Sequence, residues 1–236
     1  MKYPRRRGVL PYAPAMNYFV TGTDTAVGKT LVSCALLHAF AAQGKRVVGM
    51  KPVAAGCDDS GLNEDVIQLL AFGNITATPE QVNPYCFPQF MAPHIAAKNA
   101  GVCIEFAPIL SSYHELASQA DVVIVEGVGG FRVPLNESQD SADLAQQLAL
   151  PVILVVGMRL GCLNHALLTL RAISDCGLKC AGWVANVLDD EMPALTENIE
   201  ALQQRITVPL LGVVPHQPCP DAHAAALHLN IGLLQG

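Results

Sequence analysis

The sequence predicts an α/β fold with three layers, in which helices cover both faces of a mainly parallel sheet. From residue 16 onward, short apolar runs alternate with helical stretches. The runs are almost continuously apolar, as is typical of strands buried on both faces. Apolar residues make up 51% of the 236 residues, enough for a large core. Alternation of this kind predicts a parallel sheet between two helical layers.

The elements follow one another in a regular order. Strands are expected at 18–21, 46–50, 122–126, 152–156, 181–186 and 210–214. Helices are expected at about 28–43, 62–72, 107–119, 141–149, 162–176 and 193–205. Residues 74–104 contain four prolines and are expected to form a long irregular excursion, a type of loop that is usually functional. Ligands of such sheets bind beyond the carboxyl ends of the strands.

Charge is unevenly distributed along the chain. Four of the 14 basic residues lie within residues 1–15, a segment without acids that is expected to be a disordered basic tail and not a secretory signal. Residues 16–236, expected to form a single domain, therefore carry ten basic and 20 acidic residues. So acidic a body argues against nucleic-acid binding. The sequence contains no uninterrupted run of about 18 apolar residues, the length that a membrane-spanning helix needs. A cytoplasmic protein is therefore expected.

The eight cysteines form no CxxC pair. Several of them, such as Cys34, lie in apolar runs, so we expect buried free thiols in a reducing compartment. The paired spacing that a zinc site requires is absent.

A phosphate-binding loop is the strongest local motif. The apolar run at 18–21 leads into Gly22, and a helix begins at Gly28 after five intervening residues, one more than the usual spacing. Backbone amides at a helix N-terminus form a cradle for anions. In this pattern Lys29 reaches the terminal phosphates of a nucleotide, and the Thr30 hydroxyl binds Mg²⁺.

Three further charged residues are expected near this loop. Glu126 ends an apolar strand, where a second magnesium-binding acid belongs. Asp65 lies at the start of a helix, and Lys51 ends the second strand before a proline, which restricts continuation into a helix. Together with Lys29 they predict a pocket for Mg²⁺ and a nucleoside triphosphate.

Six motifs are distributed along residues 16–215: TGTDTAVGKT at 21–30, KPV at 51–53, VEGVGG at 125–130, PVILVVG at 151–157, LGCLNH at 160–165 and GWVAN at 182–186. Together with the variant glycine spacing, these motifs resemble those of the dethiobiotin synthetases, a family of the P-loop NTPase superfamily.

The resemblance implies an ATP-dependent and Mg²⁺-dependent ligase of biotin biosynthesis. Its substrates are 7,8-diaminopelargonic acid, carbon dioxide and ATP, and its product is dethiobiotin. One amino group takes up carbon dioxide as a carbamate, which attacks the γ-phosphate of ATP to give a mixed carbamic-phosphoric anhydride and ADP. The second amino group then closes the ureido ring and releases phosphate. Because every reacting group is anionic, such a site needs fixed positive charge.

The resemblance also implies a role for individual residues. Catalysis falls to Lys51, Lys29 and Thr25, and Mg²⁺ binding to Thr30, Asp65 and Glu126. The diamine is expected to contact Ala55, while a second subunit of a homodimer is expected to supply Leu160, Gly161, Cys162, Leu163 and Asn164. Besides Lys29, Thr30, Asp65 and Glu126, the expected ATP contacts are Ala26, Val27, Gly28, Leu31, Gly127, Val128, Gly129, Asn186, Val187, Pro215, His216 and Gln217.

Some positions depart from the family pattern. Ala55 replaces a serine that often contacts the substrate, and Ala26 stands where some members have an acid. Asn186 and Asp189 also have the Asn-x-x-Asp spacing of a guanine-binding motif, which leaves nucleotide choice open.

Three alternatives are weighed against this interpretation. A switch or partition ATPase would have the same fold, but residues 21–24 lack the lysine that such proteins carry there. A synthetase of corrin amidation usually has a glutaminase domain, for which 236 residues leave no room. A paralogue that only binds ligands would not need the lysines and acids of the pocket.

Overall fold

The computed structural model describes residues 16–58 and 61–234. The tail expected at 1–15 lies outside the described residues. The main sheet is formed by β1 (Tyr18–Gly22), β2 (Val47–Met50), β5 (Val122–Glu126), β6 (Val152–Met158), β7 (Cys180–Val187) and β8 (Leu210–Val214). The major helices are α1 (Lys29–Ala42), α2 (Glu64–Phe72), α5 (Phe106–Gln119), α6 (Ser141–Leu148), α7 (Cys162–Asp175) and α8 (Leu195–Gln203). The predicted strands and helices all form, within a few residues of their expected ends.

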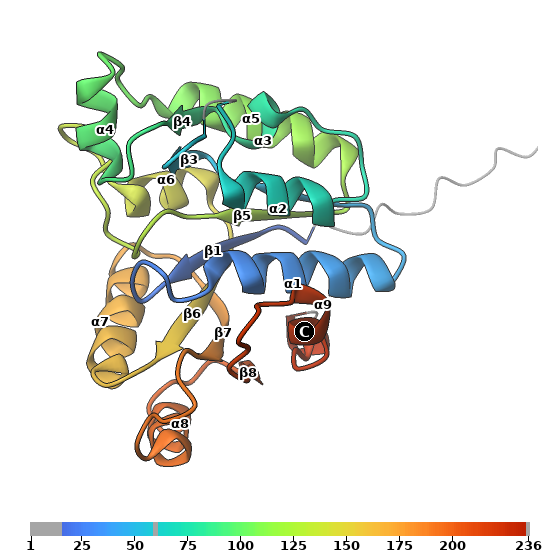
Figure 1. Cartoon of the computed structure of the whole chain (residues 1–236), viewed down its shortest axis with the longest axis vertical. Helices are drawn as coiled ribbons and strands as arrows, with labels where there is room; N and C mark the ends of the chain where they lie inside the picture. Colours follow the sequence, from blue (N-terminus) through green and yellow to red (C-terminus); the bar gives the residue numbers. More distant parts are fainter. Residues whose placement is uncertain (1–15, 59–60, 235–236) are drawn as a thin grey trace, which may run out of the picture.

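The six strands are parallel and lie in the order β2-β5-β1-β6-β7-β8 (Figure 1). Strand β1 is central, with Val20 opposite both Glu126 of β5 and Ile153 of β6. This order places the segments that follow β1, β5 and β2 side by side at the carboxyl edge. The predicted phosphate loop, Glu126 and Lys51 lie on or after these three strands.

Successive side chains of the central strands pack into different cores. Tyr18 and Val20 belong to the cluster beneath α1, with α9 (Ala222–Ala226) and the 3₁₀ helix at Ile231–Leu234. Phe19 points to the opposite face and packs with apolar residues of α5 and α6. Helices α7 and α8 cover the same sheet further along, against β6 and β7. The predicted three layers, with helices on both faces, are confirmed (Figure 1).

The excursion at 74–104 is more ordered than predicted. It contains α3 (Pro79–Val82), β4 (Tyr85–Phe87) and α4 (Pro93–Asn99). Strand β4 pairs in parallel with β3 (Val53–Ala55), which was also not predicted. Elements of three to seven residues are too short for their hydrophobic period to stand out in the sequence. Thr78 caps α3 through a capping box, so the prolines start short helices instead of preventing them.

In the described part of the chain, every helix is too short or too polar to cross a bilayer.

Candidate active site

The loop between β1 and α1 has the geometry of an anion cradle. Gly28 precedes α1 with a φ of 87°, a left-handed conformation that glycine adopts without strain. A Cβ at this position would lie 2.1 Å from Nδ2 of Asn186. Lys29 is buried and donates a hydrogen bond to the carbonyl oxygen of Asp24 at 3.0 Å, so its ammonium lies across the mouth of the loop. These features place the amides of the first turn of α1 and one lysine around a common space.

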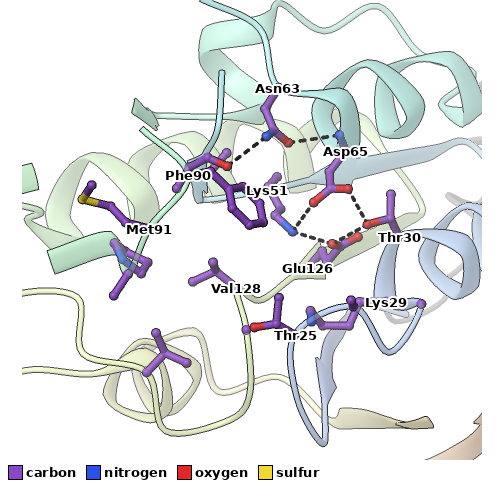
Figure 2. Close-up of a pocket in the computed structure, with 18 residues that line it drawn as sticks. Thr25, Lys29, Thr30, Lys51, Asn63, Asp65, Phe90, Met91, Glu126 and Val128 are labelled. Atoms are coloured by element: carbon purple, nitrogen blue, oxygen red, sulfur yellow. Dashed lines mark hydrogen bonds and ion pairs between the residues drawn. The ribbon is translucent and has the colours of Figure 1, made fainter. Parts of the chain in front are cut away.

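Two carboxylates meet the hydroxyl group of Thr30. Its Oγ1 lies 2.8 Å from Oδ1 of Asp65 and 2.9 Å from Oε1 of Glu126. Asp65 reaches this position because Asn63 caps α2, its side chain accepting a hydrogen bond from the Asp65 amide at 3.0 Å. Glu126 reaches it from the end of β5. The three residues expected to bind Mg²⁺ are thus brought together (Figure 2).

Lys51 lies between the two carboxylates. Its Nζ is 2.5 Å from Oε1 of Glu126 and 2.8 Å from Oδ2 of Asp65, and it also donates to the Gly127 carbonyl at 3.3 Å. The Lys51 side chain is only 4% exposed. Thr30, Asp65, Glu126 and Lys51 therefore form one connected cluster.

Burial and charge act in opposite directions on the pKa values of this cluster. Burial lowers the pKa of Lys51, but the negative charges of Glu126 and Asp65 outweigh it and raise the pKa above its ordinary value. Burial raises the pKa of Asp65, but the adjacent Lys51 ammonium outweighs it and holds this pKa below its ordinary value. Burial, together with repulsion from Lys51, lowers the pKa of Lys29 to about 8.

A cavity of about 600 Å³ opens beside the cluster. One part of its wall is polar and contains Thr25, Lys29, Thr30, Lys51, Asn63, Asp65 and Glu126; Ala26, Gly28 and Gly129 of the phosphate-binding loops adjoin it. The other part is apolar and contains Ala54, Ala55, Phe90, Met91, Ala92, Pro93, Val128 and Val133 (Figure 2). The cavity can therefore hold an anionic group next to an aliphatic one.

A second, smaller cavity of about 240 Å³ lies on the other side of the phosphate-binding loop. The Asn186 side chain at its wall donates from Nδ2 to the Val27 carbonyl at 2.9 Å, which fixes the orientation of the amide. The residues that line this cavity include Ala26, Gly28, Leu31, Asn186, Val187, Pro215, His216 and Gln217, all of which were expected to contact ATP.

Comparisons with known proteins agree with this geometry. The sequence model of a family described as "AAA domain" matches residues 16–223. The chain is 56% identical over 215 residues to the "ATP-dependent dethiobiotin synthetase BioD" of Nitrosospira multiformis, covering 91% of this chain and 95% of the relative. A relative of the same name from Aromatoleum aromaticum is 54% identical over 217 residues, covering 91% and 96% of the two chains. This chain belongs to the dethiobiotin synthetase family.

Solved structures extend the likeness to the fold alone. A ParA family ATPase from Chlorobium tepidum superposes with a TM-score of 0.54 at 13% identity, covering 90% of this chain and 89% of that one. At such low identity the two proteins share an architecture, and the comparison does not favour a partition ATPase over a dethiobiotin synthetase.

One group of site residues expected of a dethiobiotin synthetase lies apart from the first cavity. Gly161 precedes α7 with a φ of 93°, and Cys162, Leu163 and Asn164 form the first turn of that helix. Leu160 is 96% exposed. Residues 160–164 contribute to neither of the two cavities described above.

The structure also assigns positions to residues that the sequence analysis missed. Asn63 caps α2 and lines the first cavity, and Phe90 and Met91 form part of the apolar wall. Asn63 precedes two acids at a helix start, a capping pattern that is visible in the sequence. Arg159, just before residues 160–164, forms an ion pair with Asp24 of the phosphate-binding loop. This pair joins residues 135 positions apart, so no local pattern points to it.

The expectation of free thiols is wrong for two of the eight cysteines. Cys57 and Cys86 form a disulfide with a Cα–Cα distance of 6.2 Å. They lie 29 positions apart and meet because β3 and β4 pair, and neither strand was predicted. The other cysteines are free, among them Cys34 and Cys162, which are buried as expected.

The cluster fits the Mg²⁺ that the family implies. Oε2 of the fully buried Glu126 accepts no hydrogen bond from the described residues, so this carboxylate has an unused oxygen. Mg²⁺ is usually held by one or two carboxylates together with water and substrate phosphates. Within residues 16–58 and 61–234, no group of three or more His, Cys, Asp or Glu side chains forms a metal cage of its own. The donors present match a cation that arrives with a nucleotide.

Proposed function

We propose that this chain is an ATP-dependent dethiobiotin synthetase, which makes dethiobiotin from 7,8-diaminopelargonic acid, carbon dioxide and ATP. The identity of 56% to a relative of that name supports the activity. The observation that carries the chemistry is the first cavity, in which two lysines and an apolar wall adjoin the phosphate-binding loop. ATP, a carbamate and an aliphatic chain require those three kinds of surface.

Lys29 and the amides of residues 26–31 hold the triphosphate in this proposal. Lys29 is already buried at the mouth of the loop, so its charge acts on the phosphates with little screening by water. Thr25 lies on the same wall and donates its hydroxyl to the transferring phosphoryl group. The second cavity takes the base, with Asn186 at its wall.

Thr30, Asp65 and Glu126 hold Mg²⁺ in this proposal. Bound there, the ion neutralises phosphate charge that would otherwise repel an anionic nucleophile. Lys51 supplies the positive charge that binds the substrate. Its ammonium binds the carbamate that forms on one amino group and orients that oxygen toward the γ-phosphate. The carbamate oxygen attacks the γ-phosphorus, the bond to the β-phosphate oxygen breaks, and ADP leaves, which gives a carbamic-phosphoric anhydride. The second amino group then attacks the carbamoyl carbon of this anhydride and loses a proton, and inorganic phosphate leaves as the ring closes.

The apolar wall holds the aliphatic chain of the diamine. Ala55 offers a methyl group where the family often has a serine hydroxyl, so in this protein the diamine is bound there by contact and not by a hydrogen bond. Phe90 and Met91 extend the apolar surface away from the phosphates. A diamine with a long hydrocarbon chain fits this arrangement better than a polar nucleophile does.

We further propose a homodimer with shared active sites, formed by a single domain at residues 16–236. Leu160, Leu167 and Leu168, on and just before α7, are 96%, 37% and 62% exposed. Exposed leucines along one helix mark an interaction surface. Residues 160–164 at its start would then reach the substrate carboxylate of the partner subunit. We also propose a cytoplasmic enzyme without membrane partners; the acidic composition of residues 16–236 supports the absence of nucleic-acid partners.

The test is phosphate release from Mg-ATP and bicarbonate, with and without 7,8-diaminopelargonic acid, followed by mass analysis of the product. Diamine-dependent release with a product of dethiobiotin mass is expected. A rate of phosphate release that is unchanged by the diamine but increased by DNA would overturn the proposal in favour of a partition ATPase. Omitting bicarbonate is the matched control, since the carbamate cannot form without it.

A further inference from the structure

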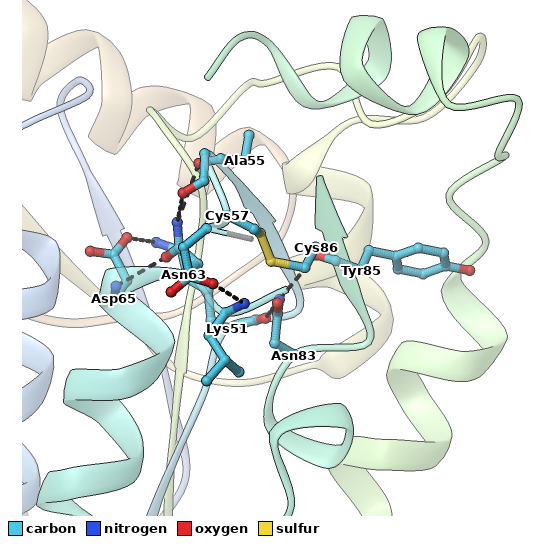
Figure 3. Close-up of a disulfide and its surroundings, with 11 residues drawn as sticks. Lys51, Ala55, Cys57, Asn63, Asp65, Asn83, Tyr85 and Cys86 are labelled. Carbon is cyan, nitrogen blue, oxygen red and sulfur yellow. Dashed lines mark hydrogen bonds and ion pairs between the residues drawn. A yellow bond between two sulfur atoms is a disulfide. The ribbon is translucent and has the colours of Figure 1, made fainter. Parts of the chain in front are cut away.

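The disulfide between Cys57 and Cys86 packs against the hydrophobic core behind the first cavity, two residues from Ala55 of the cavity's apolar wall. Cys57 lies two residues after the end of β3, and Cys86 is the middle residue of β4. Both residues are half-buried. The bond therefore links β4 to the residues just after β3, close to Ala55 (Figure 3).

We propose that Cys57 and Cys86 are a reversible dithiol–disulfide pair, whose oxidation state sets how firmly the segments bearing Asp65 and Lys51 are held.

The Cys57 side of the bond is connected to Asp65. The Asn63 side chain donates to the carbonyl oxygens of Ala55 at 3.3 Å and Gly56 at 3.2 Å, immediately before Cys57. The same side chain accepts a hydrogen bond from the Asp65 amide. Fixing Cys57 thus fixes the carbonyls that hold Asn63, and Asn63 sets the start of α2 and the position of Asp65 (Figure 3).

The Cys86 side of the bond is connected to Lys51. Three positions before Cys86, the Asn83 side chain donates to the Lys51 carbonyl at 2.5 Å and to the Tyr85 carbonyl at 3.0 Å. The Lys51 amide in turn donates to the Val82 carbonyl at 2.8 Å. Lys51, which follows β2, is therefore held by hydrogen bonds to the segment that leads into β4. The disulfide therefore joins the segment that positions Asp65 covalently to the segment that positions Lys51.

Cys57 and Cys86 are both partly exposed, whereas Cys34 and Cys162 are buried. Half-burial of both residues leaves room for attack by a small thiol or disulfide. Burial instead raises the pKa of Cys34 to about 12 and that of Cys180 to about 11, which suppresses their thiolates. The exposed Cys103 and Cys219 are free, so an internal disulfide that forms and breaks reversibly is expected at Cys57 and Cys86.

The exchange partner is a small disulfide such as glutathione disulfide. One cysteine thiolate attacks a sulfur of that disulfide, whose S–S bond breaks and releases one glutathione thiolate. The second cysteine thiolate attacks the resulting mixed disulfide and releases the second glutathione. The two cysteines lose two electrons and two protons, which the two glutathione molecules gain. Excess glutathione reverses both steps.

Reduction removes the covalent link and leaves the hydrogen bonds of Asn63 and Asn83. A cross-link closing a loop of this length restricts the open states of the chain. We therefore expect the Asp65 amide to exchange with solvent at least about tenfold faster in the reduced protein. Amides in the middle of α1, which the bond does not constrain, are expected to exchange at unchanged rates.

The experiment equilibrates the full-length protein in glutathione buffers that are either mostly oxidised or mostly reduced. After an acid quench and denaturation, mass analysis is expected to find the Cys57–Cys86 disulfide in the first case and two free thiols at these positions in the second; without glutathione bound to exposed cysteines this corresponds to six and eight thiols. Hydrogen exchange of Asp65 is then compared between the two forms. The exposed Cys103 is the matched control: Cys103→Ser should retain the redox difference, whereas Cys57→Ser and Cys86→Ser should each abolish it.

Eight titratable thiols in both buffers would overturn the pairing. If the disulfide forms and is reduced as expected but the Asp65 amide exchanges at the same rate in both forms, the proposed effect of the disulfide on the Asp65 segment would be overturned. Neither measurement requires ATP or the diamine, so these outcomes are independent of the proposed activity. One consequence does rest on that activity: reduction should raise the KM for the diamine more than the KM for ATP, because the loosened wall faces the diamine.

Discussion

The Lys51 ammonium lies 2.5 Å from Oε1 of Glu126, and the two side chains are 4% and 0% exposed. Asp65 approaches the same ammonium from the other side at 2.8 Å. Without a bound metal ion, the Lys51 ammonium supplies the positive charge that balances the two carboxylates. Mg²⁺ bound to the carboxylates would take over that charge and release Lys51 for an anionic substrate.

Lys51→Ala is expected to lower turnover by about 10²-fold or more, the size of effect seen when a transition-state donor is lost. Affinity for Mg-ATP should stay nearly intact, because Lys29 and the loop amides hold the phosphates. Without Mg²⁺ the variant should also be less stable, by up to about 3–5 kcal/mol, because Glu126 loses its buried partner.

Stopped-flow turnover, nucleotide titration and thermal melts with and without Mg²⁺ test these effects. The exposed Lys179, distant in the fold at the start of β7, gives the matched control Lys179→Ala. Turnover at the wild-type rate would contradict the role of Lys51. A melting temperature that falls equally with and without Mg²⁺ would contradict the exchange of charge between Lys51 and the metal.

Gly28→Ala is expected to abolish tight nucleotide binding. The new Cβ would lie 2.1 Å from Nδ2 of Asn186, so the phosphate-binding loop or the Asn186 amide must move. Gly44→Ala is the control, since Gly44 has a similar φ of 77° with nothing within 4 Å of the added atom. Both variants bear the strain of a positive φ, about 1–2 kcal/mol. Isothermal titration with ATP should show at least a tenfold greater loss for Gly28→Ala, and equal losses would rule out the steric cause.

The sequence predicts the main sheet and the cluster of Thr30, Glu126 and Lys51 for a common reason. Each residue follows or ends a strongly apolar strand, and parallel strands bring their carboxyl ends to one edge. The β3–β4 pair is different, because its strands have three residues each and meet across a connection of 29 residues. The disulfide depends on that pairing, so it could not be predicted from cysteine spacing.

Asn186→Ala is expected to reduce the preference for ATP over GTP. Because Nδ2 donates to the Val27 carbonyl, Oδ1 is the atom left to accept a hydrogen bond from a base. Adenine presents an amino donor at position 6, whereas guanine presents a carbonyl acceptor there. The ratio of kcat/KM for the two nucleotides should fall by about tenfold. Asn198→Ala, on the exposed side of α8, should leave the ratio unchanged; a wild-type ratio for Asn186→Ala would exclude base selection by this amide.

Asp121→Asn is expected to remove a pH-dependent part of the stability. Hydrogen bonds from the Arg46 side chain and amide lower the pKa of Asp121 to about 2, against about 4 in an unfolded chain. The carboxylate therefore stabilises the fold fully above pH 4, and this contribution is lost as the pH falls from about 4 to about 2. Because both side chains are partly exposed, it amounts to less than about 1 kcal/mol.

Urea titrations of the wild type and of Asp121→Asn should thus differ at pH 6 and converge near pH 2. The more exposed pair of Arg171 and Asp175 on α7 supplies the control Asp175→Asn, which should change little at either pH. A constant difference between wild type and Asp121→Asn over the whole range would show that the effect does not arise from ionisation of Asp121.

Leu168→Glu is expected to convert the proposed dimer into monomers. Leu168 is 62% exposed on α7, near Leu160 at 96%, and a glutamate there would place two like charges near each other across a symmetric interface. Leu227→Glu is the control, because Leu227 is 86% exposed at the end of α9, on the opposite face of the sheet. Light scattering should give half the mass for Leu168→Glu alone. Turnover should fall with the dimer, since residues 160–164 would no longer reach a partner's substrate; a fully active monomer would mean that each chain binds its substrate unaided.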